Sequence, residues 1–278
     1  MRAWRTSAIT EFDTRCEIFR DLHRSGCFVI PNPWDIGSAS VLVQLGFKAL
    51  ATTSSGFAWS MGRQDNGLTL DQSLEHFQSI ASSVPVPVNG DFEGGFAVEP
   101  RQVAINVQRA TSTGVAGLSI EDSTGDPARP LYPFELAVDR VRAARQAIDD
   151  SRSGVLLTGR SEGFIVGRPD LRETIRRLTA YAEAGAECLY APGVRTREEI
   201  SAVVGAVAPR PVNVLVGSGS TSVQELADLG VRRISVGGAL ARTAWTGFLR
   251  AAMEIRDTGT FAELGRAVPF AEINDRFS

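Results

Sequence analysis

The chain has 278 residues, of which 43% are hydrophobic and 22% are charged. This composition suits one large folded domain and excludes a disordered chain. A net charge of −3 offers no basic excess for nucleic acid or an anionic membrane. No apolar run reaches the roughly 20 residues of a membrane span, and residues 1–10 lack the apolar centre of a signal peptide. We therefore expect a soluble, cytoplasmic protein without nucleic-acid or membrane partners.

Short β-branched runs alternate with stretches rich in Ala, Arg, Glu and Leu, which predicts repeated βα units. Eight strands are expected, at residues 28–31, 48–52, 86–90, 117–120, 154–158, 187–190, 212–216 and 233–236. Amphipathic helices are expected between them, for example at 100–113 and 172–184. Several of these segments end at a glycine that suits a helix C-cap: Gly46, Gly114, Gly185 and Gly230.

Eight right-handed βα units in about 250 residues close most simply into an α/β fold of the (β/α)8, or TIM-type, barrel class. An open, doubly wound sheet is the alternative. That fold usually carries a glycine-rich dinucleotide turn after its first strand, and IPNPWDIG at residues 30–37 offers none. The whole chain, 1–278, is thus predicted to be a single barrel domain with a C-terminal helical tail from about residue 243.

Scarce residue types exclude several mechanisms, because catalytic groups of such barrels lie at the C-terminal ends of the strands. Lys48, the only lysine, precedes its strand, which argues against a Schiff base. His23 precedes the first strand and His76 lies on a helix, so neither is predicted to be a general base. The three cysteines lack metal-ligand spacing and an activating neighbour. Carboxylate, arginine and hydroxyl chemistry remain.

Two neighbouring strands end in carboxylates: Asp91 and Glu93 follow the third, and Glu121 and Asp122 follow the fourth. Alternation along an extended chain would point Asp91 and Glu93 to the same side. Converging carboxylates raise one another's pKa unless a cation neutralises them, and Mg²⁺ or Mn²⁺ suits such oxygen ligands. The sequence therefore predicts a metal at Asp91, Glu93 and Glu121. The alternative is that these acids are solvated loop charges or helix caps.

Polar residues follow two further strands. Arg160 and Glu162 end the fifth, where a guanidinium suits a substrate carboxylate or phosphonate, although a structural ion pair is the alternative. Residues 54–56 end the second strand in a turn whose N–H groups can approach an oxyanion, and Asp65 lies in the loop beyond.

The last two strands leave alternatives open. Asn213, inside the seventh strand, is either a substrate-binding donor or a buried amide. The glycine-rich loops at 217–221 and 236–240 follow strands seven and eight, where barrels often bind phosphate. They support a rival phosphate-binding protein, or they are simply tight turns.

Six stretches together resemble the isocitrate lyase and phosphoenolpyruvate mutase superfamily, over roughly residues 19–250. They are IPNPWDIGSASVLVQLGFKALATTSSGFAWSMGRQD, VPVNGDFEGGF, GVAGLSIED, TGRSEGFI, AYAEAGAECLYAPG and LADLGVRRISVGGALAR. The resemblance implies a barrel whose eighth helix is exchanged between subunits, giving dimers and usually tetramers. It also implies Mg²⁺ and a 2-oxo or 2-hydroxy acid substrate that reacts through an enolate.

The resemblance also assigns roles. Asp91 resembles the direct metal ligand, and the shell that binds metal-bound water is matched by Asp65, Glu93 and Glu121. The family's usual Asp-x-Asp is Asp-Phe-Glu here, and the longer side chain should still reach a metal-bound water.

The substrate side of the site is matched in two places. Ser55, Gly56 and Phe57 resemble the turn that receives the substrate carboxylate, and Arg160 resembles the arginine that contacts it. Four aromatic residues are candidates for shaping the pocket around the substrate: Phe57, Trp59, Tyr132 and Tyr190.

One segment departs from the family. After strand four its lyases carry Lys-Lys/Arg-Cys-Gly-His, whose cysteine is an acid, and its mutases carry Lys-x-Asn-Ser. Residues 121–134 are EDSTGDPARPLYPF here, without cysteine, lysine, histidine or asparagine. Isocitrate cleavage, methylisocitrate cleavage and phosphoryl migration are therefore disfavoured. Asp126, Arg129 and Tyr132 are the polar replacements and are candidates for a mobile lid.

The predicted function is a Mg²⁺-dependent lyase that cleaves a C–C bond of a small 2-oxo acid such as oxaloacetate. Decarboxylation or a retro-aldol cleavage would proceed through an enolate that the metal stabilises. Arg160, Asp65 and Glu121 are the predicted catalytic residues. Two alternatives stay open: C–P cleavage like that of phosphonopyruvate hydrolases, and binding of 2-oxo acids without catalysis.

The C-terminal tail from about residue 243 carries apolar side chains that suit a partner subunit: Trp245, Phe248, Phe261 and Phe270. A homo-oligomer, either a dimer or a tetramer, is expected on this basis. Packing of the tail on its own barrel is equally physical.

Overall fold

The computed structural model describes residues 11–217, 219 and 221–278. Its centre is a parallel sheet of eight strands: β1 (Phe28–Ile30), β2 (Leu50–Ala51), β3 (Val88–Asp91), β4 (Gly117–Glu121), β5 (Leu156–Arg160), β6 (Cys188–Tyr190), β7 (Val212–Leu215) and β8 (Arg233–Ser235). The strand order is β1-β8-β7-β6-β5-β4-β3-β2. The N–H of Ala51 donates to the carbonyl of Pro31 at 3.1 Å, which brings β2 next to the end of β1 and nearly closes the sheet.

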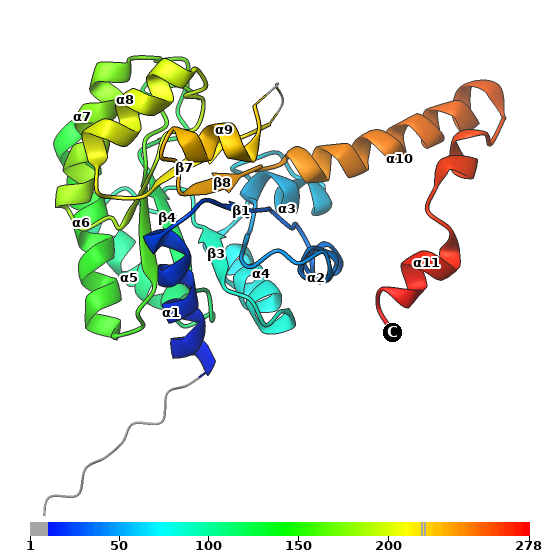
Figure 1. The fold of residues 1–278 in the computed structure, drawn as a ribbon, viewed down its shortest axis with the longest axis horizontal. Coiled ribbons are helices and arrows are strands. Elements are labelled where there is room, and N and C mark those ends of the chain that lie inside the picture. The colour runs from blue at the N-terminus through cyan, green and yellow to red at the C-terminus, as the bar shows by residue number, and fades with distance from the viewer. Residues whose placement is uncertain (1–10, 218, 220) are drawn as a thin grey trace, which may run out of the picture.

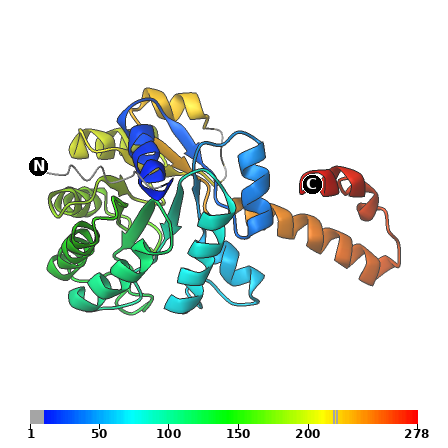
Figure 2. The ribbon, with the colours of Figure 1, turned by 90° about the horizontal axis from the view of Figure 1, so that it is seen from below.

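The (β/α)8 barrel predicted from the sequence is therefore confirmed, and the open doubly wound sheet is wrong. Each predicted strand is present, with ends that differ by two residues at most. The helices are α1 (Glu11–Arg24), α2 (Ile36–Gln44), α3 (Ser54–Ser60), α4 (Leu70–Ser83), α5 (Pro100–Thr111), α6 (Phe134–Ser151), α7 (Leu171–Glu183), α8 (Arg197–Val207), α9 (Val223–Asp228), α10 (Ala239–Thr258) and α11 (Phe270–Asp275), with a 3-10 turn η1 (Glu263–Arg266). They surround most of the sheet (Figure 2).

Glycines mark the ends of the helices, as the sequence predicts. Gly46 and Gly185 directly follow the C-caps of α2 and α7 with φ angles of 91° and 104°. A side chain is strained in this left-handed region, so glycine ends the helix at low cost and turns the chain toward the next strand.

Helix α1 closes the end of the barrel where the strands begin. The Arg20 guanidinium donates to the carbonyl of Gly154 at 2.5 Å, just before β5. Phe19 is fully buried, and a Cβ on Gly117 at the start of β4 would lie 2.5 Å from its ring. Glycine is therefore required at position 117. Since α1 closes this end of the barrel, the functional site is expected at the opposite end.

The C-terminal segment does not cover the barrel as the other helices do. Figure 1 shows α10 leaving the barrel after β8 and extending away from it, before η1 and α11 turn back. Ala241 is the buried residue of α10, whereas several large apolar side chains of the segment are exposed: Trp245, Phe248, Leu249, Met253, Phe261, Leu264, Phe270 and Phe277. The helical part begins at Ala239, four residues before the predicted start at about 243.

The apolar core lies between the strands and the surrounding helices. Buried strand residues that contribute to it include Leu118 and Ile120 of β4, Leu157 of β5, Leu189 of β6 and Ile234 of β8. Across the described ranges, no helix is both long enough and apolar enough to span a membrane.

Candidate active site

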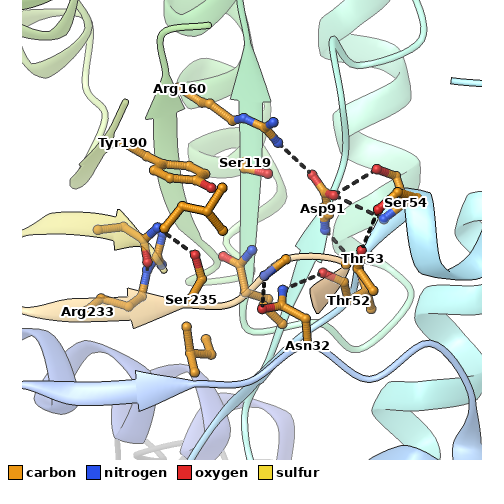
Figure 3. Close-up of a pocket in the computed structure, with 18 of the residues that line it drawn as sticks. Asn32, Thr52, Thr53, Ser54, Asp91, Ser119, Arg160, Tyr190, Arg233 and Ser235 are labelled. Carbon is orange, nitrogen blue, oxygen red and sulfur yellow. Dashed lines mark hydrogen bonds and ion pairs between the residues drawn. The ribbon is translucent and has the colours of Figure 1, made fainter. Parts of the chain in front are cut away.

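A cavity of about 160 Å³ opens where the strands end. Residues from all eight strands, or from the positions just after them, line it. Its wall is formed by Asn32, Thr52, Thr53, Ser54, Ser55, Asp65, Asn89, Asp91, Ser119, Arg160, Tyr190, Asn213, Arg233 and Ser235, among others (Figure 3). The wall is polar, whereas the interior of such barrels is usually filled by branched apolar side chains.

Arg160, the last residue of β5, lies among carboxylates. Its guanidinium is 3.0 Å from a Glu121 oxygen and 3.3 Å from an Asp91 oxygen, and it also forms an ion pair with Glu162. Burial opposes the charged guanidinium, but Glu121 and Glu162 outweigh it and raise the pKa of Arg160 well above its ordinary value. A permanently charged arginine is therefore placed at the wall of the cavity.

The acids around Arg160 carry more negative charge than it can neutralise. Burial raises the pKa of Glu93 to about 8, with further contributions from Asp91 and Asp65. Burial likewise raises the pKa of Glu121 well above its ordinary value, against the opposing effect of Arg160. A carboxyl group that resists ionisation in this way favours either a proton or a bound cation.

Asp91 is held in place by the start of α3. The Ser54 N–H and hydroxyl donate to one Asp91 oxygen at 3.1 and 2.9 Å. The turn at residues 54–56, predicted to approach an oxyanion, is the first turn of α3, and the Ser54 amide donates to a carboxylate of the protein itself. Thr53 caps this helix, and its hydroxyl lies 3.1 Å from that of Ser55.

The reason predicted for the pairing of Asp91 and Glu93 is wrong. Strand β3 ends at Asp91, and Glu93 lies beyond it in the left-handed region with φ 47°. A turn, and not the alternation of an extended strand, brings Glu93 back to the cluster. Its carbonyl accepts the N–H of Glu121 at 3.0 Å, which joins the two acidic segments through the backbone.

The residues of this cluster fit a divalent cation. The donors are all carboxylate oxygens, and the buried Oε1 of Glu93 has no hydrogen-bond partner. Asp91, Glu93 and Glu121 would hold the ion, with Asp65 close by. In the conformation of the described residues, no three His, Cys, Asp or Glu side chains are gathered tightly enough to enclose a metal, since Asp91 and Glu121 hold Arg160 instead.

The family model of phosphoenolpyruvate phosphomutase matches residues 19–256. The chain belongs to this family. A Burkholderia cenocepacia J2315 structure, described only in general terms as a lyase/mutase, is 46% identical with a TM-score of 0.94, over 96% of this chain and 98% of that one. Oxaloacetate decarboxylase of Paraburkholderia xenovorans (strain LB400) is 30% identical over 230 residues, 78% of this chain and 73% of that protein.

A third relative is a structure of oxaloacetate acetylhydrolase in complex with the product oxalate. It is 25% identical with a TM-score of 0.82, and the match covers 94% of this chain and 93% of that one. The superfamily resemblance drawn from the sequence is confirmed. This member of the phosphoenolpyruvate phosphomutase family thus stands among lyases and mutases.

The segment that departs from the family's lyases lies outside the cavity of this family member. It folds as a short hairpin in which Ser123 pairs with Leu131. The ring of Tyr132 covers the Arg140 guanidinium at 3.9 Å, and Asp126 pairs with Arg129 at 3.5 Å. In this conformation Asp126 and Arg129 therefore contact each other, and Tyr132 contacts helix α6 of the barrel. None of these three lid candidates lines the cavity.

Two predicted substrate-binding residues already have partners within the protein. Asn213 is buried, with its carbonyl oxygen accepting from Arg233 at 2.9 Å and its amide donating to Ser235 at 2.9 Å. Phe57 stacks on His76, with ring centroids 3.8 Å apart, and this pair lines a different groove. Among the described residues of the predicted site, the cavity is lined by Ser55, Asp65, Asp91, Arg160 and Asn213, and it is not lined by Gly56, Phe57, Glu93 and Glu121.

The glycine-rich loops of the rival phosphate-binding reading line a second cavity of about 580 Å³, next to the first. Gly217, Gly219 and Gly237 belong to it, together with Arg195 and Arg242. Residues 218 and 220 of the predicted phosphate loop lie outside the described residues. Phosphate binding there stays a prediction.

Asp122 has a structural part in the site. It is buried and accepts three bonds: from the Glu162 N–H at 2.7 Å, the Tyr181 hydroxyl at 2.6 Å and Arg177 at 3.1 Å. These bonds fix the backbone just after Arg160, so Asp122 positions the arginine and its partner Glu162.

Sequence reasoning missed Arg233 and Ser235 in the cavity wall. Both lie on β8 at positions of the same parity, which in a strand places them on one face. An arginine at an inward-facing strand position was the available signal, because such positions are normally apolar in barrels.

Proposed function

We propose that this protein is a divalent-metal-dependent lyase that breaks a C–C bond of a small 2-oxo acid, with decarboxylation of oxaloacetate as the simplest reaction. The observation that carries the proposal is the excess of buried carboxylates around a single arginine at the cavity wall. Similarity to oxaloacetate decarboxylases at about 30% identity supports the same reaction class.

A divalent cation held by Asp91, Glu93 and Glu121 would polarise the 2-oxo group and stabilise negative charge on its oxygen. With Asp91 and Glu121 bound to the cation, they would no longer occupy the Arg160 guanidinium. Its planar group would then be available for a two-point contact with the substrate carboxylate. Glu162 stays paired with Arg160 and, being fixed by Asp122 through its N–H, keeps the guanidinium oriented.

Decarboxylation suits the groups that are present. When the bond to the leaving carboxylate breaks, its electron pair moves into the enolate, and no protein acid is needed to start the reaction. The segment in which the family's lyases carry their acidic cysteine has none here and lies outside the cavity. This combination favours decarboxylation over cleavage of isocitrate-type substrates.

Purified protein incubated with oxaloacetate and Mg²⁺ should form pyruvate faster than Mg²⁺ alone, and EDTA should abolish the difference. Asp91→Ala should lower this rate by at least about a hundredfold, because one metal-holding carboxylate is removed. Asp71→Ala, on an exposed ion pair with Arg109, is the matched control and should keep the wild-type rate.

A pyruvate rate equal to that of free Mg²⁺ would contradict the proposal. Release of inorganic phosphate from phosphonopyruvate would favour C–P cleavage instead. Tight binding of 2-oxo acids without turnover would favour a binding protein.

We also propose that the chain forms a homo-oligomer through α10 and the segment after it. Helix α10 carries Trp245, Phe248, Leu249 and Met253 at positions i, i+3, i+4 and i+8, so they form one exposed apolar face. A face of this size is unfavourable in water, and a second copy of the chain is the partner that every molecule of the protein has available.

A further inference from the structure

The cavity contains a charge that the proposed function does not use. Arg233 is buried at the start of β8, and its guanidinium donates to the Thr158 hydroxyl at 3.0 Å and the Asn213 carbonyl oxygen at 2.9 Å. A third contact, of 3.3 Å, joins it to His23 Nε2. Burying a guanidinium without an opposing charge is costly, so a functional reason is expected.

His23 is an uncharged partner of Arg233. Burial, with Arg233 as the second cause, lowers the pKa of His23 to about 3. Its Nδ1 lies 2.7 Å from the carbonyl of Phe19 and so carries the proton, which leaves the Nε2 lone pair for Arg233. Since Thr158 and Asn213 are also neutral, the positive charge of Arg233 is not cancelled by these three contacts.

A directed chain of hydrogen bonds leads from this cation to the cavity. Arg233 can only donate, so it fixes the Asn213 amide with its oxygen toward Arg233 and its nitrogen toward Ser235. Ser235 accepts from Asn213 at 2.9 Å, and it lines the cavity together with Tyr190, whose ring lies next to it in Figure 3. With its oxygen occupied by Asn213, Ser235 has its proton left to donate to the Tyr190 oxygen.

Tyr190 ends this chain beside Arg160. It is the last residue of β6, lines the cavity and lies with its ring centroid 5.2 Å from the Arg160 guanidinium carbon. Figure 3 shows the ring between Arg160 and Ser235. If Ser235 donates to the phenol oxygen, the Tyr190 proton is free to point at a molecule bound on Arg160.

We propose that Tyr190 is the acid that protonates the enolate carbon, and that the chain Arg233–Asn213–Ser235 orients and polarises its hydroxyl for this step. The inference rests on the proposed function, since it names the proton donor of the same site. A hydrogen-bond chain that begins at a buried cation strengthens each donor along it. The ring position also suits the step, because C3 of a 2-oxo acid is only two bonds from the carboxyl carbon that Arg160 would hold.

The step balances as follows. The electron pair of the enolate C2–C3 double bond forms a new C3–H bond with the Tyr190 proton, and the C2–O bond returns to a carbonyl. Tyr190 is left as a phenolate beside the Arg160 guanidinium and regains its proton from water. Burial raises the pKa of Tyr190 to about 12, so the hydroxyl is protonated and ready to donate near neutral pH.

Three other hydroxyls at the cavity already have partners in the protein. Ser54 donates to Asp91, and the hydroxyls of Thr53 and Ser55 bond to each other. Tyr190 differs from these three because the hydrogen bonds from Arg233 through Asn213 to Ser235 lead toward it.

The reverse of this step can be measured alone, as exchange of the methyl protons of pyruvate for deuterium in D₂O with Mg²⁺, followed by proton NMR. Wild-type protein should catalyse exchange, and Tyr190→Phe should slow it by about 10²–10⁴-fold, the usual contribution of a general acid or base. Ser235→Ala should slow it by about tenfold, because Tyr190 remains but loses its orienting partner. Ser82→Ala, which removes an exposed hydroxyl on α4, is the control and should exchange as wild type does.

Binding of oxalate with Mg²⁺, measured by calorimetry, separates this role from a structural one, because oxalate has no carbon to protonate. All four proteins should bind oxalate alike. The inference would be overturned if Tyr190→Phe exchanged as fast as the wild-type protein, or if its oxalate affinity fell by as large a factor as its exchange rate. It would also be overturned if the wild-type protein catalysed no exchange. Exchange by the wild-type protein without pyruvate formation from oxaloacetate would instead overturn the proposed decarboxylation and leave Tyr190 as the acid.

Discussion

At the scale of one residue, the environment of the Glu93 carboxyl group favours a bound cation. Its carboxyl lies in a left-handed turn, buried beside Asp91 and Asp65, with one oxygen that has no hydrogen-bond partner. Without an ion this group is uncharged at neutral pH, since its pKa is raised to about 8. Binding of a divalent cation must therefore release a proton, and metal affinity should increase with pH.

The raised pKa of Glu93 predicts the pH dependence of stability of the metal-free protein. Between about pH 4.5, its ordinary pKa, and pH 8, folded Glu93 holds a proton that the unfolded chain has lost. The free energy of unfolding should therefore fall as the pH rises through this window. Thermal unfolding in EDTA measures it, and Glu93→Gln should flatten the slope. A slope unchanged in that variant would contradict the assignment to Glu93.

Asp122 gives a prediction about stability at the same scale. Asp122→Ala removes the carboxylate that faces Arg177 and the Tyr181 hydroxyl, and it leaves a buried guanidinium with less compensation. The expected loss is about 3–5 kcal/mol of unfolding free energy. Asp139→Ala, on an exposed pair with Arg142, is the control and should change it by less than about 1 kcal/mol. Denaturant titration of both variants measures these free energies of unfolding. Equal losses in the two variants would contradict the structural role of Asp122.

At the scale of elements, the packing of α1 into the barrel base depends on a missing side chain. In β4, Gly117 lies where a Cβ would be 2.5 Å from Phe19 and 2.6 Å from Asn89. The helix brings Phe19 and His23 into the barrel, and His23 in turn contacts Arg233. Helix α1 is therefore coupled to the polar chain that leads to the cavity.

Gly117→Ala should destabilise the protein by about 1–3 kcal/mol, because an added methyl group overpacks a rigid site. Gly205→Ala, inside α8 with no atom within 4 Å of the new Cβ, is the matched change and should stabilise it by up to about 1 kcal/mol. Urea unfolding measures both. Similar effects of the two substitutions would mean that α1 adapts to the methyl group.

At the scale of the whole molecule, the barrel is self-contained but its C-terminal segment is not. Helix α10 extends from the barrel with exposed aromatic side chains (Figure 1). The end of the chain turns back to the barrel, where the Gln44 side chain donates to the Arg276 carbonyl at 2.5 Å. The apolar face of α10 is left uncovered by this arrangement, which is the basis of the proposed oligomer.

Phe248→Asp should therefore reduce the oligomer to a smaller species, because a charge replaces a side chain that is 60% exposed on the apolar face. Ile105→Asp on α5, at a position 45% exposed, is the control and should keep the wild-type mass. Light scattering after size-exclusion chromatography measures the masses. A wild-type protein that already runs as a single chain would refute the proposed interface.

Local sequence patterns were enough to predict the barrel and the positions of its acids along the chain. Alternating βα patterns and helix-ending glycines are local signals, so eight strands were predicted with ends correct to within two residues. Because parallel strands end on one side of a sheet, the placement of Asp91, Glu121 and Arg160 at strand ends was enough to bring them together, and Asp91 and Arg160 line the cavity.

Contacts between residues far apart in the chain could not be predicted from such patterns and are seen in the folded structure. Asp91 and Glu121 pair with Arg160, a turn returns Glu93 to the cluster, and Arg233 connects through Asn213 to the neighbourhood of Tyr190. Such contacts follow from the barrel's register and side-chain packing, for which a local pattern carries no signal. The same holds for α10, whose amphipathic sequence predicts a buried face but not which surface covers it.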